Sequence, residues 1–227
     1  MHKKIIIAVV VSVFAPILIQ AQAIGRQIEV KPTGVYAQID MKEVNKMTEV
    51  LLKDGPRKKK EKVISKILAS PNKYMPGLLC AMAYELMKQG KKDQAAFWFF
   101  VGLIRVGYDT ERCADETVGD AMTIVNTHLG PPIYEYVLAN PDKFKEAVEK
   151  AIDFVRKNNE EYDQRWINLH GMGFFMEEEG GSSRELSKPK EDWSKIKEQA
   201  LTDFHEGFLQ VLEDSSSNKQ DEPEKTN

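Results

Sequence analysis

Cysteine is scarce in this chain of 227 residues, which contains only Cys80 and Cys113. Neither a Cys-x-x-Cys nor a His-x-x-x-His pair occurs, and such closely spaced pairs are the usual ligands of zinc. The His-Glu-x-x-His motif, the Gly-x-Ser-x-Gly elbow and the glycine-rich phosphate loop are missing as well. The sequence therefore predicts a non-catalytic protein with no metal and no cofactor.

Long hydrophobic runs are also few. Beyond the N-terminal run, the most apolar stretch is Ala95 to Val106, which is too short to cross a bilayer and is interrupted by Gly102. A strong positive charge is lacking too, because the formal net charge is -3. We therefore expect no membrane insertion after signal cleavage and no binding to nucleic acid.

The N-terminus does contain an export signature. Met1-His2-Lys3-Lys4 is followed by an apolar run from Ile5 to Ile19 and by Ala21-Gln22-Ala23, a small-x-small cleavage site. These three features are typical of a secretory signal peptide over residues 1–23. The sequence thus predicts a protein that is periplasmic or secreted, with Ile24 as its first mature residue.

An oxidising compartment favours a disulfide between the two cysteines. Cys80 lies near the start of one expected helix, and Cys113 follows an antiparallel hairpin that would return the chain to the same end. We therefore predict a Cys80–Cys113 disulfide. The alternative is that Cys80 is a small core residue and Cys113 an unrelated thiol.

Proline, glycine and capping residues divide the remainder into helices. The first expected helix is capped by Asp40, carries an apolar stripe from Met41 to Leu51 and is ended by Gly55-Pro56. The others run from about Arg57 to Ala69, Pro76 to Gly90, Gln94 to Arg105, Asp109 to Leu129, Pro132 to Leu138, Pro141 to Lys157 and about Asp192 to Leu212. Residues 24–39 are expected to form an extended arm, residues 40–213 an α-helical domain and residues 214–227 a disordered acidic tail. The fold class is all-α, an irregular multi-helix bundle.

Two features of these helices carry specific expectations. The basic run Arg57 to Lys60, with Lys62 and Lys66, lies opposite an apolar stripe, so we expect a solvated face or, alternatively, a surface for an anionic partner. Gly102 stands among large aromatic residues in a helix that is apolar nearly all round. This pattern predicts a buried helix with a close crossing at Gly102.

The hairpin from Pro76 to Gly102 also resembles a known family. Its small and aromatic positions are similar to the pattern of tetratricopeptide-like helical hairpins. These positions are Ala83, Leu86, Gly90, Ala95, Trp98 and Gly102. The resemblance covers this one hairpin, and it implies a scaffold that binds proteins or peptides.

The segment from Tyr162 to Phe175 has neither a helical nor a strand period, yet it is rich in aromatic and hydrogen-bonding residues. Such a segment is either packed against the helices or forms a binding surface. We predict partner binding by five of its residues, with structural packing as the alternative. The five are Tyr162, Arg165, Trp166, His170 and Phe174.

These observations favour an exported helical protein that binds another protein in the cell envelope. Its most specific form is an immunity protein against a periplasm-targeted toxin. One alternative is an envelope adaptor that holds peptides in the groove of the hairpin. Another is a hydrolase that uses His170 and Asp163 as an acid–base pair, followed by Glu177 to Glu179.

Overall fold

The structure is a computed structural model that describes residues 32–176 and 185–218. The predicted signal peptide, residues 24–31 of the arm and residues 219–227 of the tail lie outside the described residues. The α-helices are α1 Lys42–Leu52, α2 Arg57–Ala69, α3 Pro76–Lys88, α4 Lys92–Arg112, α5 Asp120–Leu129, α6 Pro131–Ala139, α7 Pro141–Lys157, α8 Met172–Phe175 and α9 Trp193–Asn218. Short 3-10 helices are η1 Gly34–Gln38, η2 Pro71–Lys73, η3 Glu116–Gly119, η4 Gln164–His170 and η5 Lys190–Asp192. The all-α prediction is confirmed.

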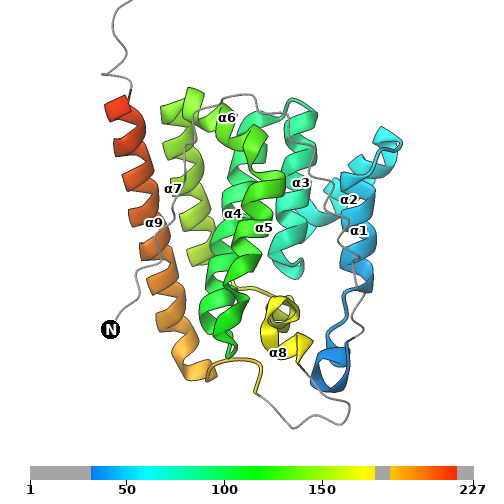
Figure 1. Ribbon diagram of the computed structural model, residues 1–227. Helices are drawn as coiled ribbons and strands as arrows, with labels where there is room; N and C mark the ends of the chain where they lie inside the picture. The colour runs from blue at the N-terminus through cyan, green and yellow to red at the C-terminus, as the bar shows by residue number, and fades with distance from the viewer. Residues whose placement is uncertain (1–31, 177–184, 219–227) are drawn as a thin grey trace, which may run out of the picture.

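The hairpin of α3 and α4 lies at the centre of the bundle (Figure 1). Helices α7 and α9 pack on α4 at one side, and α1 packs on α3 at the other. Helix α5 lies in front of the hairpin, and α8 lies below α5. In the described part of the chain, no helix is both long and apolar enough to cross a membrane.

The α3–α4 crossing explains the glycine at position 102. A Cβ atom added there would overlap the Cys80 sulfur and would lie 3.1 Å from the Pro76 carbonyl oxygen. Only a residue without a side chain lets the two backbones approach this closely. The turn before α4 uses a second glycine, Gly90, whose φ of 79° is left-handed. The predicted close crossing is confirmed.

The predicted end of the central helix is wrong. We expected a break between Arg105 and Asp109, but α4 continues to Arg112, and Cys113 leaves it in an extended conformation. Three polar residues on this extra length, Arg105, Asp109 and Arg112, are buried. They continue the helix because each has partners inside the protein, which the local sequence does not reveal.

The length of α4 also separates the two cysteines. Both thiols are free and buried, so the predicted disulfide is wrong. Cys80 packs against Gly102, and Cys113 lies eleven residues further along, about 16 Å at the rise of an α-helix. A disulfide needs Cα atoms roughly 4.4 to 6.8 Å apart. Burial raises the pKa of the Cys113 thiol to about 11, so this thiol is protonated near neutral pH.

Lys60 departs from the solvated face that we expected of the basic run. It is buried, and its Nζ donates to the Leu51 carbonyl and to the Glu85 carboxylate, both at 2.9 Å. Lys60 thereby stabilises the C-terminal end of α1 and links it to α3. Its neighbours Lys58, Lys59 and Lys62 are exposed, as predicted.

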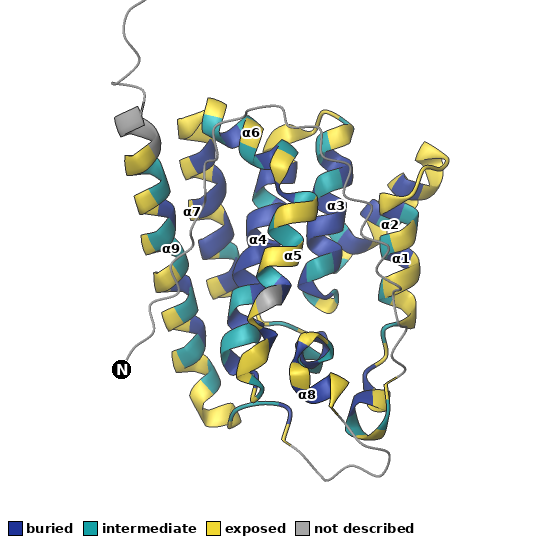
Figure 2. Cartoon of the chain, in the orientation of Figure 1, coloured by how far each residue is buried: buried dark blue, intermediate teal, exposed yellow. Residues whose placement is uncertain are grey.

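The predicted boundaries of the N-terminal arm and the C-terminal tail are also wrong. Residues 34–38 of the expected extended arm form η1, which buries Tyr36. Helix α9 continues through residues 214–218 of the expected tail. Tyr36 belongs to a second, smaller hydrophobic cluster at the α8 end of the bundle, which Figure 2 shows in dark blue inside that end.

Candidate functional site

The segment from Tyr162 to Phe175 folds into the short helices η4 and α8. The expectation that it has no regular structure is therefore wrong. Asp163 begins η4, because its Oδ1 accepts a hydrogen bond from the Arg165 backbone N–H at 3.0 Å. Gly171 then separates η4 from α8 in an extended conformation. The two short helices form a compact corner below α5 (Figure 1).

One buried carboxylate holds η4 on the bundle. Asp109 of α4 is 0% exposed and accepts hydrogen bonds from Tyr162 Oη at 3.0 Å and Trp166 Nε1 at 2.7 Å. Arg112 donates to the same carboxylate through Nη2 at 2.5 Å and Nε at 3.0 Å. Burial raises the pKa of Asp109 to about 6, although the Arg112 charge and these hydrogen bonds act in the opposite direction.

The cation that pairs with Asp109 is itself enclosed by aromatic rings. The Arg112 guanidinium lies 4.2 Å from the Tyr108 ring centroid and 4.7 Å from that of Trp193. Cation–π contacts of this kind favour a guanidinium over an ammonium group. The Asp109 anchor, which we define as Asp109, Arg112, Tyr162 and Trp166, is therefore hydrogen-bonded and enclosed.

A second set of contacts holds α8. The Met172 N–H donates to Thr117 Oγ1 at 2.7 Å, and the Gly173 N–H donates to Asp115 Oδ2 at 2.9 Å. A Cβ atom at Gly171 would overlap the Asp115 carboxylate, so the approach requires glycine. On the inner side of α8, Phe174 packs edge-on against Tyr36, with centroids 5.6 Å apart.

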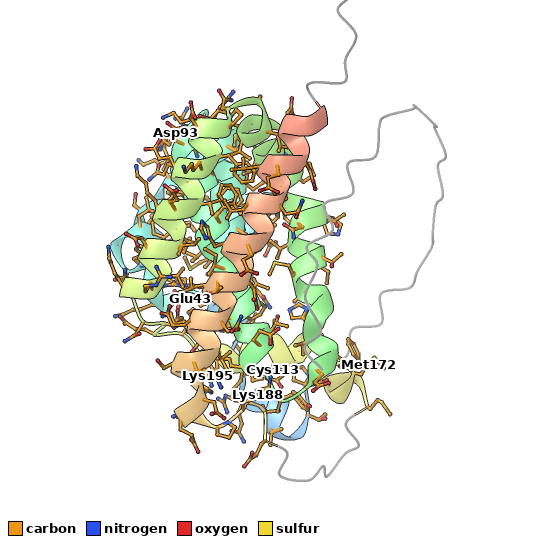
Figure 3. All side chains as sticks on the ribbon, turned by 90° about the vertical axis from the view of Figure 1, so that its left-hand side faces the viewer. Glu43, Asp93, Cys113, Met172, Lys188 and Lys195 are labelled. Atoms are coloured by element: carbon orange, nitrogen blue, oxygen red, sulfur yellow. The ribbon has the colours of Figure 1, made fainter. Side chains whose placement is uncertain are left out.

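The outer side of α8 is apolar and exposed. Met172, Phe175 and Met176 are 53%, 54% and 72% exposed, respectively. In the described ranges 32–176 and 185–218, six large hydrophobic residues are exposed, and these are three of them. Figure 3 shows Met172 at the edge of the molecule, pointing away from the bundle. We call Met172, Phe175 and Met176 the α8 knob.

The structure corrects three of the five predicted partner-binding residues. Tyr162, Trp166 and Phe174 are buried and serve as packing and anchoring residues. Arg165 is half-buried and forms an ion pair with Asp163 at 2.7 Å. His170 is exposed and packs edge-on against Trp166, with ring centroids 5.5 Å apart.

The α8 knob was not predicted from the sequence. Its signal was the spacing of apolar residues around glycine, since Gly171 allows the close approach to Asp115 while Met172 and Phe175 are exposed. This distinction depends on where Asp115 and Thr117 lie, and both are more than fifty residues away in the chain.

The acid–base pair of the hydrolase alternative does not form. Asp163 and His170 lie at opposite ends of η4, about 14 Å apart at the rise of a 3-10 helix, and the Asp163 carboxylate is bound by Arg165. The glutamates from Glu177 to Glu179 lie outside the described residues. Within the described residues, no group of three or more His, Cys, Asp or Glu side chains is arranged to hold a metal ion.

A pocket of about 330 Å³ lies elsewhere, between the start of α4 and α7. Phe97 and Ala147 form its apolar part, and charged side chains surround them. These charges are paired with one another, with Lys143 bound to Asp93 at 3.1 Å and Lys150 bound to Glu146 at 2.7 Å. The charged side chains of this pocket therefore satisfy one another, which leaves Gln94 as its uncharged polar lining residue.

Comparison with protein-family models, curated proteins and solved structures finds no match to this chain. The tetratricopeptide-like resemblance of the Pro76 to Gly102 hairpin therefore stays a prediction. The geometry of the described residues carries the functional argument.

Proposed function

We propose that this chain is a non-catalytic, exported protein that binds another protein through the α8 knob. The observation that carries the proposal is the clustering of three exposed apolar side chains, Met172, Phe175 and Met176, within five consecutive residues. Scattered exposed apolar residues are normal, whereas a contiguous apolar patch is typical of an interaction site. Methionine and phenylalanine are also enriched at protein interfaces.

The energetics of the knob support this function. Burying a Met or Phe side chain fully contributes about 1.5 to 3 kcal/mol. Because each of the three is more than half exposed, covering them would contribute about 3 to 5 kcal/mol. This is the range of an interface hot spot. The anchors beneath the knob hold its backbone in place, which lowers the ordering cost of binding.

The adaptor alternative has less support, because the hairpin groove is filled by the chain itself. Helix α3 is covered by α1, α5 and α6, and α4 is covered by α7 and α9. The side chains that would line a peptide groove, among them Leu79, Met82 and Leu86, are fully buried. The more specific proposal is an immunity protein, for which the α8 knob would be the toxin-binding surface.

A photo-crosslinking experiment tests the proposed function. We would place p-benzoylphenylalanine at Phe175 of the full chain in its native host, with Leu209 as the matched control. Leu209 is 42% exposed on α9, so it reports on apolar exposure without the knob.

We expect a discrete adduct with another protein from position 175 and none from position 209. The adduct should disappear when Met172 and Met176 are both changed to serine. Absence of an adduct at position 175, or the same adducts from both positions, would refute the proposal.

A further inference from the structure

Two outer helices of the bundle carry opposite charge. Residues 57–66 of α2 contain six lysines and arginines and one glutamate. Residues 198–214 of α9 contain five aspartates and glutamates and neither lysine nor arginine. Helix α8, which carries the knob, belongs to neither segment. The chain therefore has a basic helix and an acidic helix in addition to the α8 knob.

The basic charge of α2 is concentrated on one side of the helix. Lys58, Lys59 and Lys62 are exposed, and at about 100° per residue they lie within about a third of the helix circumference. Arg57 pairs with Glu61 at 2.8 Å. None of the three lysines forms an ion pair with a described residue. We call Lys58, Lys59 and Lys62 the α2 basic face.

The acidic charge of α9 is also concentrated on one side. Asp203, Glu206 and Glu213 are exposed, and the steps of three and seven residues between them correspond to about one and two helical turns. Asp203 accepts a hydrogen bond from the uncharged amide of Gln199 at 2.8 Å, which does not neutralise its charge. We call Asp203, Glu206 and Glu213 the α9 acidic face.

This distribution of charge does not stabilise the two helices. Lys58 and Lys62 stand four residues apart, a spacing at which like charges destabilise a helix. The first turn of α2 has no acidic residue, although the N-terminal end of a helix favours negative charge. The last turn of α9 has no basic residue, although the C-terminal end favours positive charge. Contact with a surface of opposite charge would therefore stabilise both helices.

The two faces cannot neutralise each other within one molecule. Helix α2 packs on α1 and α3, whereas α9 packs on α4 and α7. Figure 1 shows α9 and the pair of α1 and α2 at opposite sides of the bundle. Figure 2 shows exposed residues, in yellow, on the outer side of each. A neighbouring molecule, by contrast, can bring one face against the other.

We propose that the α2 basic face of one copy binds the α9 acidic face of a second copy of the chain. Such a contact joins two different surfaces, so each added copy leaves one basic and one acidic face free, and the product is an open chain or a closed ring. Exposed ion pairs are individually weak and screened by salt. The association is therefore weak and depends on the whole set of charges.

A membrane of anionic lipids is a less suitable occupant of the α2 basic face. Helices that lie on membranes insert an apolar side between the lipids. Helix α2 directs its apolar residues Ile64 and Ile67 into the core, and none of its large hydrophobic residues is exposed. Fixed carboxylates on a protein surface match this purely polar face better.

Sedimentation velocity of the full chain tests the inference. The mass is measured over a range of protein concentrations in about 0.01 M and about 1 M salt, where the screening lengths are about 30 Å and about 3 Å. One variant neutralises the basic face, Lys58→Gln/Lys59→Gln/Lys62→Gln. A second neutralises the acidic face, Asp203→Asn/Glu206→Gln/Glu213→Gln. The matched control removes three exposed lysines at the α3–α4 turn, Lys88→Gln/Lys91→Gln/Lys92→Gln.

We expect the mass of the wild type to rise with concentration in low salt and to return to that of the monomer in high salt. Each face variant should weaken the association at least tenfold, and the control should leave it unchanged. Each face variant keeps one intact face. An equimolar mixture of the two should therefore form a dimer that does not extend, and circular dichroism should show that both variants are folded.

A wild type that stays monomeric in low salt would refute the inference, as would face variants that associate like the wild type or a mixture that stays monomeric. Capture by phosphatidylglycerol vesicles without self-association would identify a membrane as the occupant and overturn it. Loss of association in Met172→Ser/Met176→Ser alone would assign the contact to the α8 knob and also overturn it.

The inference is independent of the proposed function, because neither face includes a residue of α8. Copies crosslinked to each other have twice the mass of the chain, so they are distinguished from an adduct with another protein at position 175. The two face variants should leave that adduct unchanged.

Discussion

Removal of the Asp109 carboxylate should destabilise the protein severely. Asp109→Ala leaves the Arg112 guanidinium, the Tyr162 hydroxyl and the Trp166 indole N–H without their acceptor. Breaking a buried ion pair costs about 3 to 5 kcal/mol, and each unsatisfied buried donor costs about 1 to 3 kcal/mol more. These costs are not additive within one network, so we expect a loss of about 5 kcal/mol.

That loss equals the whole stability of a marginal domain, so milder variants are needed for a quantitative test. Asp109→Asn keeps an acceptor for Tyr162 and Trp166 but removes the charge, and we expect it to cost about 2 kcal/mol, in line with a charged hydrogen bond. The double variant Asp109→Leu/Arg112→Leu removes both charges. It should regain at least half of the loss of Asp109→Ala, because an apolar pair often replaces a buried ion pair without cost.

Urea denaturation followed by circular dichroism measures each free energy of unfolding. We expect the order wild type, Asn variant, double variant, Ala variant, from most to least stable, with the middle two close together. An Asp109→Ala protein as stable as the wild type would show that Asp109 does not hold η4. A double variant less stable than Asp109→Ala would show that the ion pair itself stabilises the fold.

The same residue predicts a pH dependence. Burial raises the folded-state pKa of Asp109 to about 6, above the value of about 3.9 expected in the unfolded chain. Between these values the folded state binds the proton more tightly, so the contribution of Asp109 to stability decreases as pH rises from about 4 to 6. The stability of the wild type relative to Asp109→Asn should therefore decrease as pH rises across this window. A constant difference would contradict the raised pKa of Asp109.

Three further predictions concern the central hairpin and the cysteines. Gly102→Ala should lower the free energy of unfolding by about 1 to 3 kcal/mol through overpacking against Cys80, and a second change, Cys80→Ala, should restore most of the lost melting temperature. An unshifted melting temperature in the single variant would contradict the close α3–α4 crossing. Trp98→Ala should lower the free energy of unfolding by about 3 to 5 kcal/mol, because the ring is buried and packs edge-on against Phe154 of α7 with centroids 5.3 Å apart. A variant as stable as the wild type in urea denaturation would place Trp98 outside the core. Alkylation of denatured, unreduced protein should modify two thiols, which mass spectrometry counts. An unmodified product two hydrogens lighter than the reduced protein would show that Cys80 and Cys113 do form a disulfide.

The sequence alone determined the helical class and most local boundaries. Helix α2 begins and ends at the predicted residues Arg57 and Ala69, and α7 spans the predicted Pro141 to Lys157. Proline and glycine act within a few residues of their own position, so these boundaries follow from local backbone geometry. The close approach at Gly102 was also predicted, because a glycine among large apolar residues of a helix indicates that another backbone passes close by.

The tertiary structure decided which polar residues are buried and which apolar residues are exposed. Lys60 is buried because Leu51 and Glu85 accept its hydrogen bonds, and α4 passes its predicted end because Asp109 binds residues more than fifty positions away. The same distant contacts turn Tyr162 and Trp166 inward. They leave the α8 knob exposed. A contact with a residue far along the chain leaves no periodic pattern in the local sequence. Only the folded structure therefore shows which residues of this segment are buried anchors and which are exposed.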